Sequence, residues 1–190
     1  FAATKNSKER IIRMGENPNY VFFTGSPGID EITHSQITPK QILEKQYDVA
    51  FNGNEIILLY HPITNDTLLT KKEISVVLDV IAKIKKPTIM IAPNSDAGSN
   101  FVIQKMQSYV KKYNFIKLFK NVPRQDFLGF LLYGGVLVGN SSSGMIEASY
   151  FSIPVVNIGL RQQDREHGKN VINIPIAALN SVYAGVAKAL

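Results

Sequence analysis

Cysteine is absent from this chain of 190 residues. Its absence excludes a disulfide scaffold, a thiolate nucleophile and a zinc site with cysteine ligands, and it is compatible with the cytosol. Long apolar runs are missing too, because Lys, Glu, Asp or Asn interrupts every such run well short of about 18 residues. No secretory signal pattern is visible. We therefore expect a cytoplasmic protein without a membrane segment.

The motifs of common cofactor and metal sites are also missing. No cluster of side chains has metal-ligand spacing. Neither a phosphate loop of the Gly-Lys-Ser/Thr type nor the strand-linked glycine pattern of dinucleotide folds is present. Internal repeats and low-complexity tracts are absent, which argues against solenoid and disordered proteins. The sequence therefore predicts an ordered globular protein with no cofactor and no metal.

Acidic residues are fewer than basic ones, 15 against 21, which gives a net charge of +6. This balance suits an anionic ligand but is common in ordinary proteins. The densest basic run is spread over a predicted helix and strand, and comprises Lys105, Lys111, Lys112, Lys117 and Lys120. Aromatic and basic residues do not interleave on one surface, so we expect no nucleic-acid partner.

Apolar runs of strand length alternate with amphipathic runs of helix length, which predicts an α/β fold with a Rossmann-like parallel sheet flanked by helices. The expected strands are Val21–Thr24, Glu55–Tyr60, Thr88–Ala92, Ile116–Phe119, Val136–Val138, Val155–Ile158 and Val171–Ile174. The expected helices are Thr4–Met14, Lys71–Lys85, Phe101–Tyr113, Asp126–Leu132, Ser143–Phe151 and Ile176–Leu190.

The first 25 residues differ from the rest of the chain. No strand precedes the first helix, no methionine precedes Phe1, and Gly25-Ser26-Pro27-Gly28 forms a break. We expect residues 1–25 to be a helix and strand left from an interdomain connection, and residues 26–190 to be one domain. The chain is then the C-terminal part of a longer protein.

Polar residues follow four of the predicted strands, whereas mainly turn residues precede them. Ligands of open α/β sheets lie outside the carboxyl ends of the strands, so this edge is the candidate site. The polar segments are His61-Pro62, Pro93-Asn94-Ser95-Asp96, Gly139-Asn140-Ser141-Ser142 and Gly159-Leu160-Arg161-Gln162.

Ser141 and Ser142 stand where a helix is expected to begin. Their hydroxyls and the first backbone amides suit phosphate oxygens, although serine is also a common helix cap. Three serines in a row with Gly144 favour the phosphate. Glu147, near the expected helix start, either complements the helix dipole or accepts hydrogen bonds from the two ribose hydroxyls. The neighbouring residues favour the ribose role.

The remaining candidates each have a plainer alternative. The fork of Arg161 suits a diphosphate, but it also suits a surface ion pair. His61 is either a structural histidine, a contact to the diphosphate or an acid for the leaving group. Asn94 either contacts the ligand or only marks a turn. The charged run from Gln163 to His167 supplies either a phosphate contact or loop salt bridges.

In this order, the motifs resemble those of the C-terminal half of the hydrolysing UDP-N-acetylglucosamine 2-epimerases, enzymes of sialic-acid and related nonulosonic-acid biosynthesis. The resemblance spans nearly the whole chain. It is carried by Arg13-Met14-Gly15-Glu16-Asn17-Pro18, Gly25-Ser26-Pro27-Gly28, His61-Pro62, Pro93 to Ser99, Asn140 to Gly144, and Asn157 to Gln162 with Arg165-Glu166. The last tract looks like that of the hydrolysing branch.

This resemblance implies the C-terminal, UDP-binding domain of a two-domain GT-B-type fold whose catalytic N-terminal domain is missing. UDP-binding positions are His61, Asn94, Val122, Ser141, Ser142, Glu147 and Arg161, and the catalytic assignments are His61 and Arg161. The family eliminates UDP across C1 and C2 of the sugar and then adds water. We expect the chain alone to bind UDP weakly without turnover, and its parent to be a homo-oligomer acting on a UDP-sugar.

Two alternatives remain open from the residues. A GT-B glycosyltransferase would present a similar edge in its C-terminal half, although the tract from Gly159 to Glu166 favours the epimerase. A nucleotide-binding or RNA-binding module without catalysis is suggested only by the net charge.

Overall fold

The computed structural model describes residues 1–190, which form two units, Phe1–Gln36 and Ile37–Leu190. The division falls after Gln36 rather than after the expected residue 25, because helix α2 (Pro27–His34) belongs to the first unit. The break before α2 has a simple local cause. Pro27 occupies the first turn of the helix, where its missing N–H costs nothing and its fixed φ suits the helix.

The first unit contains helix α1 (Lys5–Arg13), a short 3-10 helix η1 (Pro18–Tyr20) and α2. Thr4 caps α1, because its hydroxyl accepts a hydrogen bond of 3.0 Å from the N–H of Ser7. The predicted strand at Val21–Thr24 is wrong. Phe23 forms only an isolated parallel bridge with Ala2, and no regular strand lies beside it to extend a ladder.

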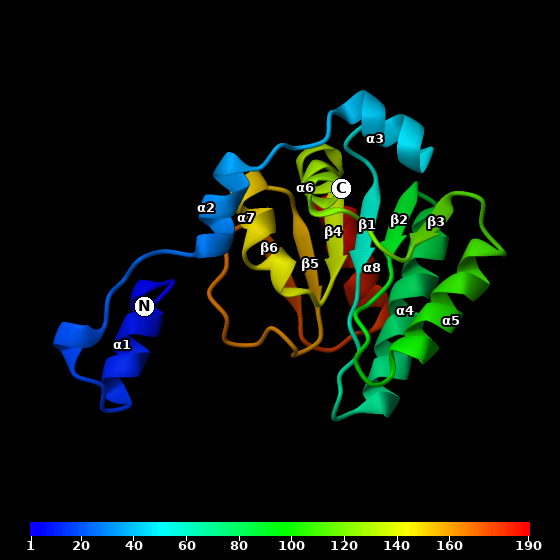
Figure 1. Ribbon diagram of the computed structural model, residues 1–190. Helices are drawn as coiled ribbons and strands as arrows, with labels where there is room; N and C mark the ends of the chain where they lie inside the picture. The colour runs from blue at the N-terminus through cyan, green and yellow to red at the C-terminus, as the bar shows by residue number, and fades with distance from the viewer. The chain divides into compact units, whose positions relative to one another are not determined.

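The second unit is a six-stranded parallel sheet with helices on both faces (Figure 1). Its strands are β1 (Ile56–Leu59), β2 (Thr88–Ile91), β3 (Ile116–Phe119), β4 (Val136–Gly139), β5 (Val155–Ile158) and β6 (Val171–Ile174). Its helices are α3 (Lys40–Tyr47), α4 (Thr67–Ile84), α5 (Ser99–Val110), α6 (Arg124–Tyr133), α7 (Glu147–Phe151) and α8 (Leu179–Ala189), with a 3-10 turn η2 (Ser142–Gly144). The strand order is β3-β2-β1-β4-β5-β6. The predicted α/β class and parallel sheet are confirmed.

Burial explains why the strands read as apolar runs. Ile56 and Leu58 of β1 belong to the core cluster under α4, α5 and α8, whereas Ile57 and Leu59 belong to the cluster under α3, α6 and α7. A parallel sheet covered on both faces needs apolar residues at every strand position, not at alternate ones. None of the helices combines the length and apolar character needed to cross a membrane.

Helix α3 was not predicted from the sequence. It is held to α6 by the buried carboxylate of Asp126, which accepts hydrogen bonds from Thr38, from Gln46 at 2.9 Å and from Tyr47 at 2.7 Å. Burial, followed by this contact with Asp126, raises the pKa of the Tyr47 phenol. The helix therefore depends on a tertiary contact that no local pattern shows.

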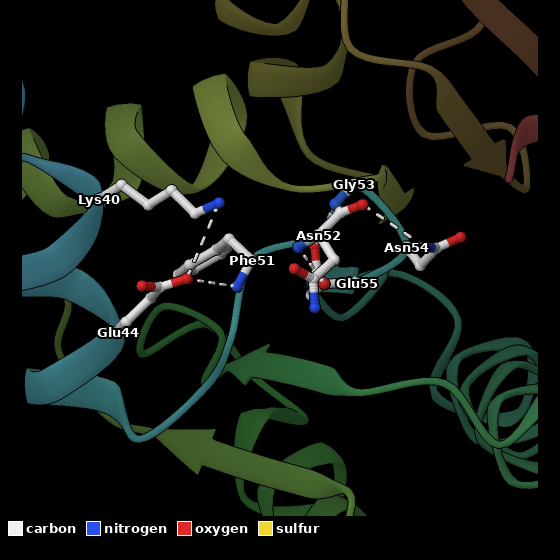
Figure 2. Close-up of polar contacts among 7 residues, drawn as sticks. All are labelled: Lys40, Glu44, Phe51, Asn52, Gly53, Asn54 and Glu55. Atoms are coloured by element: carbon white, nitrogen blue, oxygen red, sulfur yellow. Dashed lines mark hydrogen bonds and ion pairs between the residues drawn. The ribbon is translucent and has the colours of Figure 1, made fainter.

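Two carboxylates accept hydrogen bonds from the backbone N–H groups that precede β1 (Figure 2). Buried Glu55 accepts hydrogen bonds from the backbone N–H groups of Asn52, at 2.7 Å, and Gly53, at 3.0 Å. Glu44 accepts one of 3.0 Å from the N–H of Phe51. These contacts satisfy the chain at its turn into β1, so this end of the sheet is built for stability.

Candidate functional site

The candidate residues from the sequence lie at the carboxyl ends of the strands. His61 follows β1, Asn94 follows β2, Val122 follows β3, Ser141 and Ser142 follow β4, Glu147 begins α7, and Arg161 follows β5. Strand β1 is paired with β2 on one side and with β4 on the other. The chain continues from β1 to β2 and from β4 to β5, so the connections after these two central strands run in opposite directions. Such a topological switch point is where open α/β sheets bind ligands.

Asn140 joins the ends of the two central strands. Its Oδ1 accepts a hydrogen bond of 2.7 Å from the backbone N–H of His61, and its Nδ2 donates one of 2.9 Å to the His61 carbonyl oxygen. The side chain of Asn140 is completely buried. It stands after Gly139, whose φ is +138° and whose added Cβ would collide with the Leu59 carbonyl oxygen. The backbone of β4 therefore lies against β1 at this point.

Arg161 is hydrogen-bonded to Asn140 as well. The backbone carbonyl oxygen of Asn140 accepts hydrogen bonds from Arg161 Nη1, at 3.1 Å, and from Gln162 Nε2, at 2.9 Å. A guanidinium carries more N–H donors than this single bond uses, so Arg161 is held in place and can still bind an anion. The chain has thus brought His61 and Arg161, which are far apart in sequence, to one shared residue, Asn140.

His61 also contacts the end of β2. Its Nδ1 lies 3.2 Å from Asn94 Oδ1, and Asn94 Nδ2 donates a hydrogen bond of 2.7 Å to the Asp96 carboxylate. Burial lowers the pKa of His61 below its ordinary value of 6.5, and the charge of Arg161 lowers it further, while the contact with Asn94 and the charge of Asp96 oppose these effects. The imidazole is therefore mainly neutral near pH 7.

The segment after β4 differs from the single helix expected over Ser143–Phe151. Ser142–Gly144 form the 3-10 turn η2, and α7 begins only at Glu147 and has five residues. Ser141 caps η2, with its Oγ accepting a hydrogen bond of 3.3 Å from the Ser143 N–H. Because α7 is so short, any phosphate binding here depends on hydroxyls, local N–H groups and Arg161 rather than on a helix dipole.

Glu147 lies close to the connection between β3 and α6. Its Oε1 is 3.6 Å from Nη1 of Arg124, two residues beyond Val122. The Glu147 side chain retains 17% of its exposure, so the carboxylate can still be reached. The ion pair links the residue expected to bind ribose to the segment expected beside the uracil.

A cavity of about 340 Å³ opens at the segment that follows β5. It is lined by residues of the β5 and β6 ends, including Asn157, Gln162, Asp164, Arg165, His167 and Asn173. The buried Oδ1 of Asn157 and Oε1 of Gln162 have no hydrogen-bond partner. Part of the charged run from Gln163 to His167 therefore lines this cavity. The structure groups no three His, Cys, Asp or Glu side chains in the manner of a metal site.

The sequence did not reveal three residues of this site. Asn140 was part of a recognised motif, but its role as the junction requires the pairing of β1 with β4. Gln162 and Arg124 were likewise assigned no role, and they are seen to matter only through their contacts with Asn140 and Glu147. The one signal in the sequence is an Asn placed directly after an apolar strand, where a polar side chain needs hydrogen-bond partners.

The solved structure of the Methanocaldococcus jannaschii UDP-GlcNAc 2-epimerase, in complex with UDP-GlcNAc and UDP, shares the fold of this chain. The TM-score is 0.72 at 16% identity, with 100% of this chain and 53% of that chain covered. A solved Staphylococcus aureus structure, described as an MnaA-UDP co-structure, gives a TM-score of 0.72 at 18% identity and covers 99% of this chain and 49% of that one. The predicted Rossmann-like fold is confirmed.

Sequence comparison identifies closer relatives. The hydrolysing UDP-N,N'-diacetylbacillosamine 2-epimerase of Legionella pneumophila is 33% identical over 190 residues, which are 100% of this chain and 50% of that protein. The chain spans about half the length of the curated relatives it matches. The sequence model of the family described as UDP-N-acetylglucosamine 2-epimerase matches residues 1–190. The chain therefore belongs to the UDP-N-acetylglucosamine 2-epimerase family.

Proposed function

We propose that the carboxyl edge of the sheet binds the UDP part of a UDP-sugar, and that the chain supplies the nucleotide-binding half of a hydrolysing UDP-sugar 2-epimerase. The observation that carries the proposal is the junction at Asn140, which holds His61 and Arg161 together at the switch point of the sheet. Family membership and the name of the relative from Legionella pneumophila support the reaction.

Each candidate residue has a distinct part in this proposal. Arg161 binds the diphosphate by charge-assisted hydrogen bonds, together with the hydroxyls of Ser141 and Ser142. Glu147 accepts the ribose hydroxyls. His61 and Asn94 complete the contacts on the β1 and β2 side, and the backbone at Val122 lies beside the uracil. These assignments rest on the positions of the residues along one edge and on the family resemblance.

In the proposed reaction the C1–O bond to UDP breaks and the proton at C2 is lost, which leaves an unsaturated sugar. Water then adds to give the 2-epimeric sugar and free UDP. Arg161 is placed to stabilise the negative charge that develops on the departing diphosphate. Mainly neutral His61 can donate one hydrogen bond to the same group without the cost of burying a charge.

Calorimetric titration of the chain with UDP tests the site. Arg161→Ala and Glu147→Ala should each weaken UDP binding, by about tenfold or more, which corresponds to about 1.4 kcal/mol. Lys86→Ala is the matched control, since it removes an equal charge at the amino end of β2. If both site variants bind UDP like the unaltered chain, the assignment is wrong.

Turnover is a separate expectation. The chain alone should not release UDP from UDP-N-acetylglucosamine, because the resemblance places the acid and base carboxylates in the other half of the enzyme. Detectable UDP release from the purified chain would contradict this. The family match does not favour a GT-B glycosyltransferase. The cytoplasmic location and the homo-oligomeric parent stay predictions.

A further inference from the structure

A buried tyrosine and a buried glutamate lie directly behind the candidate site. Tyr60 is the residue between β1 and His61, and it is completely buried. Its hydroxyl donates a hydrogen bond of 2.8 Å to Oε2 of Glu73, which projects from α4 and is only 2% exposed. Burial of a carboxyl group is costly, and no role assigned so far uses this one.

The carboxylate of Glu73 also lies against the turn that carries Arg161. A Cβ atom added to Gly159 would stand 2.5 Å and 2.7 Å from the two carboxylate oxygens. Gly159 has a φ of +73°, and its N–H donates a hydrogen bond of 2.9 Å to the Ile174 carbonyl oxygen. Gly159, the first residue of this turn, is thus enclosed between α4 and β6, and only glycine fits there without strain.

The pKa shifts of Glu73 and Tyr60 agree with the contacts that join them to each other and to the segment of Arg161. Burial raises the pKa of Glu73, while the hydrogen bond from Tyr60 opposes that shift. Burial and the neighbouring Glu73 raise the pKa of Tyr60, and the positive charge of Arg161 acts against them. The guanidinium of Arg161 is therefore close enough to influence the Tyr60 phenol as well as the His61 imidazole.

We propose that Glu73 is a positioning residue for the diphosphate site, because it holds both strand ends that carry the candidate catalytic side chains. Through Tyr60 it fixes the end of β1 before His61, and through Gly159 it fixes the turn before Arg161. This inference rests on the proposed UDP function. It adds that α4, together with Asn140 and the ladders that join β1, β4 and β5, controls the distance between His61 and Arg161.

Ligands with and without the diphosphate give the first test. Glu73→Ala should weaken UDP binding to the full chain by about tenfold, whereas uridine binding, followed by NMR titration, should change by less than about twofold. Glu73→Gln should retain most of the UDP affinity, because its amide oxygen can accept the same hydrogen bond from Tyr60. Unchanged UDP affinity in Glu73→Ala, or an equal loss for uridine, would overturn the proposal.

Hydrogen exchange supplies a second test that needs no ligand. In Glu73→Ala the backbone amides of Gly159 and Gln163, which donate hydrogen bonds to the carbonyl oxygens of Ile174 and Leu160, should exchange faster than in the unaltered chain. In Glu73→Gln they should not. Glu44→Ala, which removes a carboxylate at the amino end of the sheet, is the control and should leave these amides unaffected. If the unaltered chain fails to bind UDP, the proposed function is wrong, whereas unchanged exchange in Glu73→Ala refutes the positioning role itself.

Discussion

Asn140 binds the backbone of His61 at both of its polar groups, with distances of 2.7 Å to the N–H and 2.9 Å to the carbonyl oxygen. One amide side chain thus replaces the two ladder contacts that are lost where β1 and β4 end. The backbone carbonyl oxygen of Asn140 accepts hydrogen bonds from Arg161 and Gln162. The same residue therefore supports the end of the sheet and orders the candidate site.

Replacing Asn140 should be among the more damaging changes at this edge. Asn140→Ala removes two hydrogen bonds and leaves partly buried backbone groups unpaired, so the free energy of unfolding should fall by about 2–3 kcal/mol. Urea denaturation would measure it. Asn54→Ala, in an exposed loop with one bond of 3.4 Å, is the control and should stay within about 0.5 kcal/mol. A similar small effect in both variants would contradict the role of Asn140.

The pH dependence of stability should show the burial of His61. Because its folded pKa lies below the ordinary 6.5, the unfolded chain takes up the proton first as the pH falls. The contribution of neutral, buried His61 to the free energy of unfolding is fully present above about pH 6.5, and it is lost as the pH falls from there through the folded pKa. His61→Asn should remove this part of the dependence, measured by denaturation between pH 7.5 and 5. An NMR titration midpoint for His61 at or above 6.5 would be inconsistent with the structure.

The ion pair between Arg124 and Glu147 suggests a ribose-specific test. Glu147→Gln should weaken the binding of UDP by about fivefold to tenfold, since one charged acceptor is lost. Binding of 2',3'-dideoxy-UDP should hardly change, because that ligand lacks the hydroxyls. Calorimetry with both ligands would decide. A parallel loss for the two ligands would show that Glu147 acts on the fold or the phosphates instead.

The amino end of the sheet should affect stability without affecting the ligand. Glu55→Ala leaves the N–H groups of Asn52 and Gly53 without their acceptor, and should cost about 2–3 kcal/mol of unfolding free energy. UDP affinity, measured well below the unfolding temperature, should remain within about twofold of the unaltered chain. Glu9→Ala, which removes only an exposed ion pair with Arg13, is the stability control. A change in UDP affinity for Glu55→Ala would mean that the two ends of the sheet are coupled.

Much of the second unit could be predicted because its signals are local. The strands Ile116–Phe119, Val155–Ile158 and Val171–Ile174 agree with the sequence pattern to the residue, since each is a short, mainly apolar run that a polar or turn residue follows. The grouping of His61, Asn94 and Arg161 on one edge followed from the parallel sheet alone. The contacts among them could not follow, because they pass through Asn140 and depend on strand order.

The errors have a common physical cause. Val21–Thr24 has the composition of a strand but no ladder partner beyond Ala2, and α3 has weak periodicity but a buried anchor at Asp126. The expected helix over Ser143–Phe151 is interrupted between Gly144, where η2 ends, and Glu147, where α7 begins. Gly144 packs against the next strand, since an added Cβ would be 3.0 Å from Val155 Cγ1. In each case a tertiary contact, absent from any local window, overrides the local preference.

The register of the central strands has a consequence for how this fold can vary. Leu59 is level with Ile91 on one side and with Gly139 on the other, and Gly139 is level with Asn157. Each strand has only four residues, so inserting or deleting one residue would turn its remaining side chains to the opposite face and shift its end relative to Asn140. Changes in length should therefore be tolerated in helices and outer loops, whereas the distance from each strand to its first polar residue should not change.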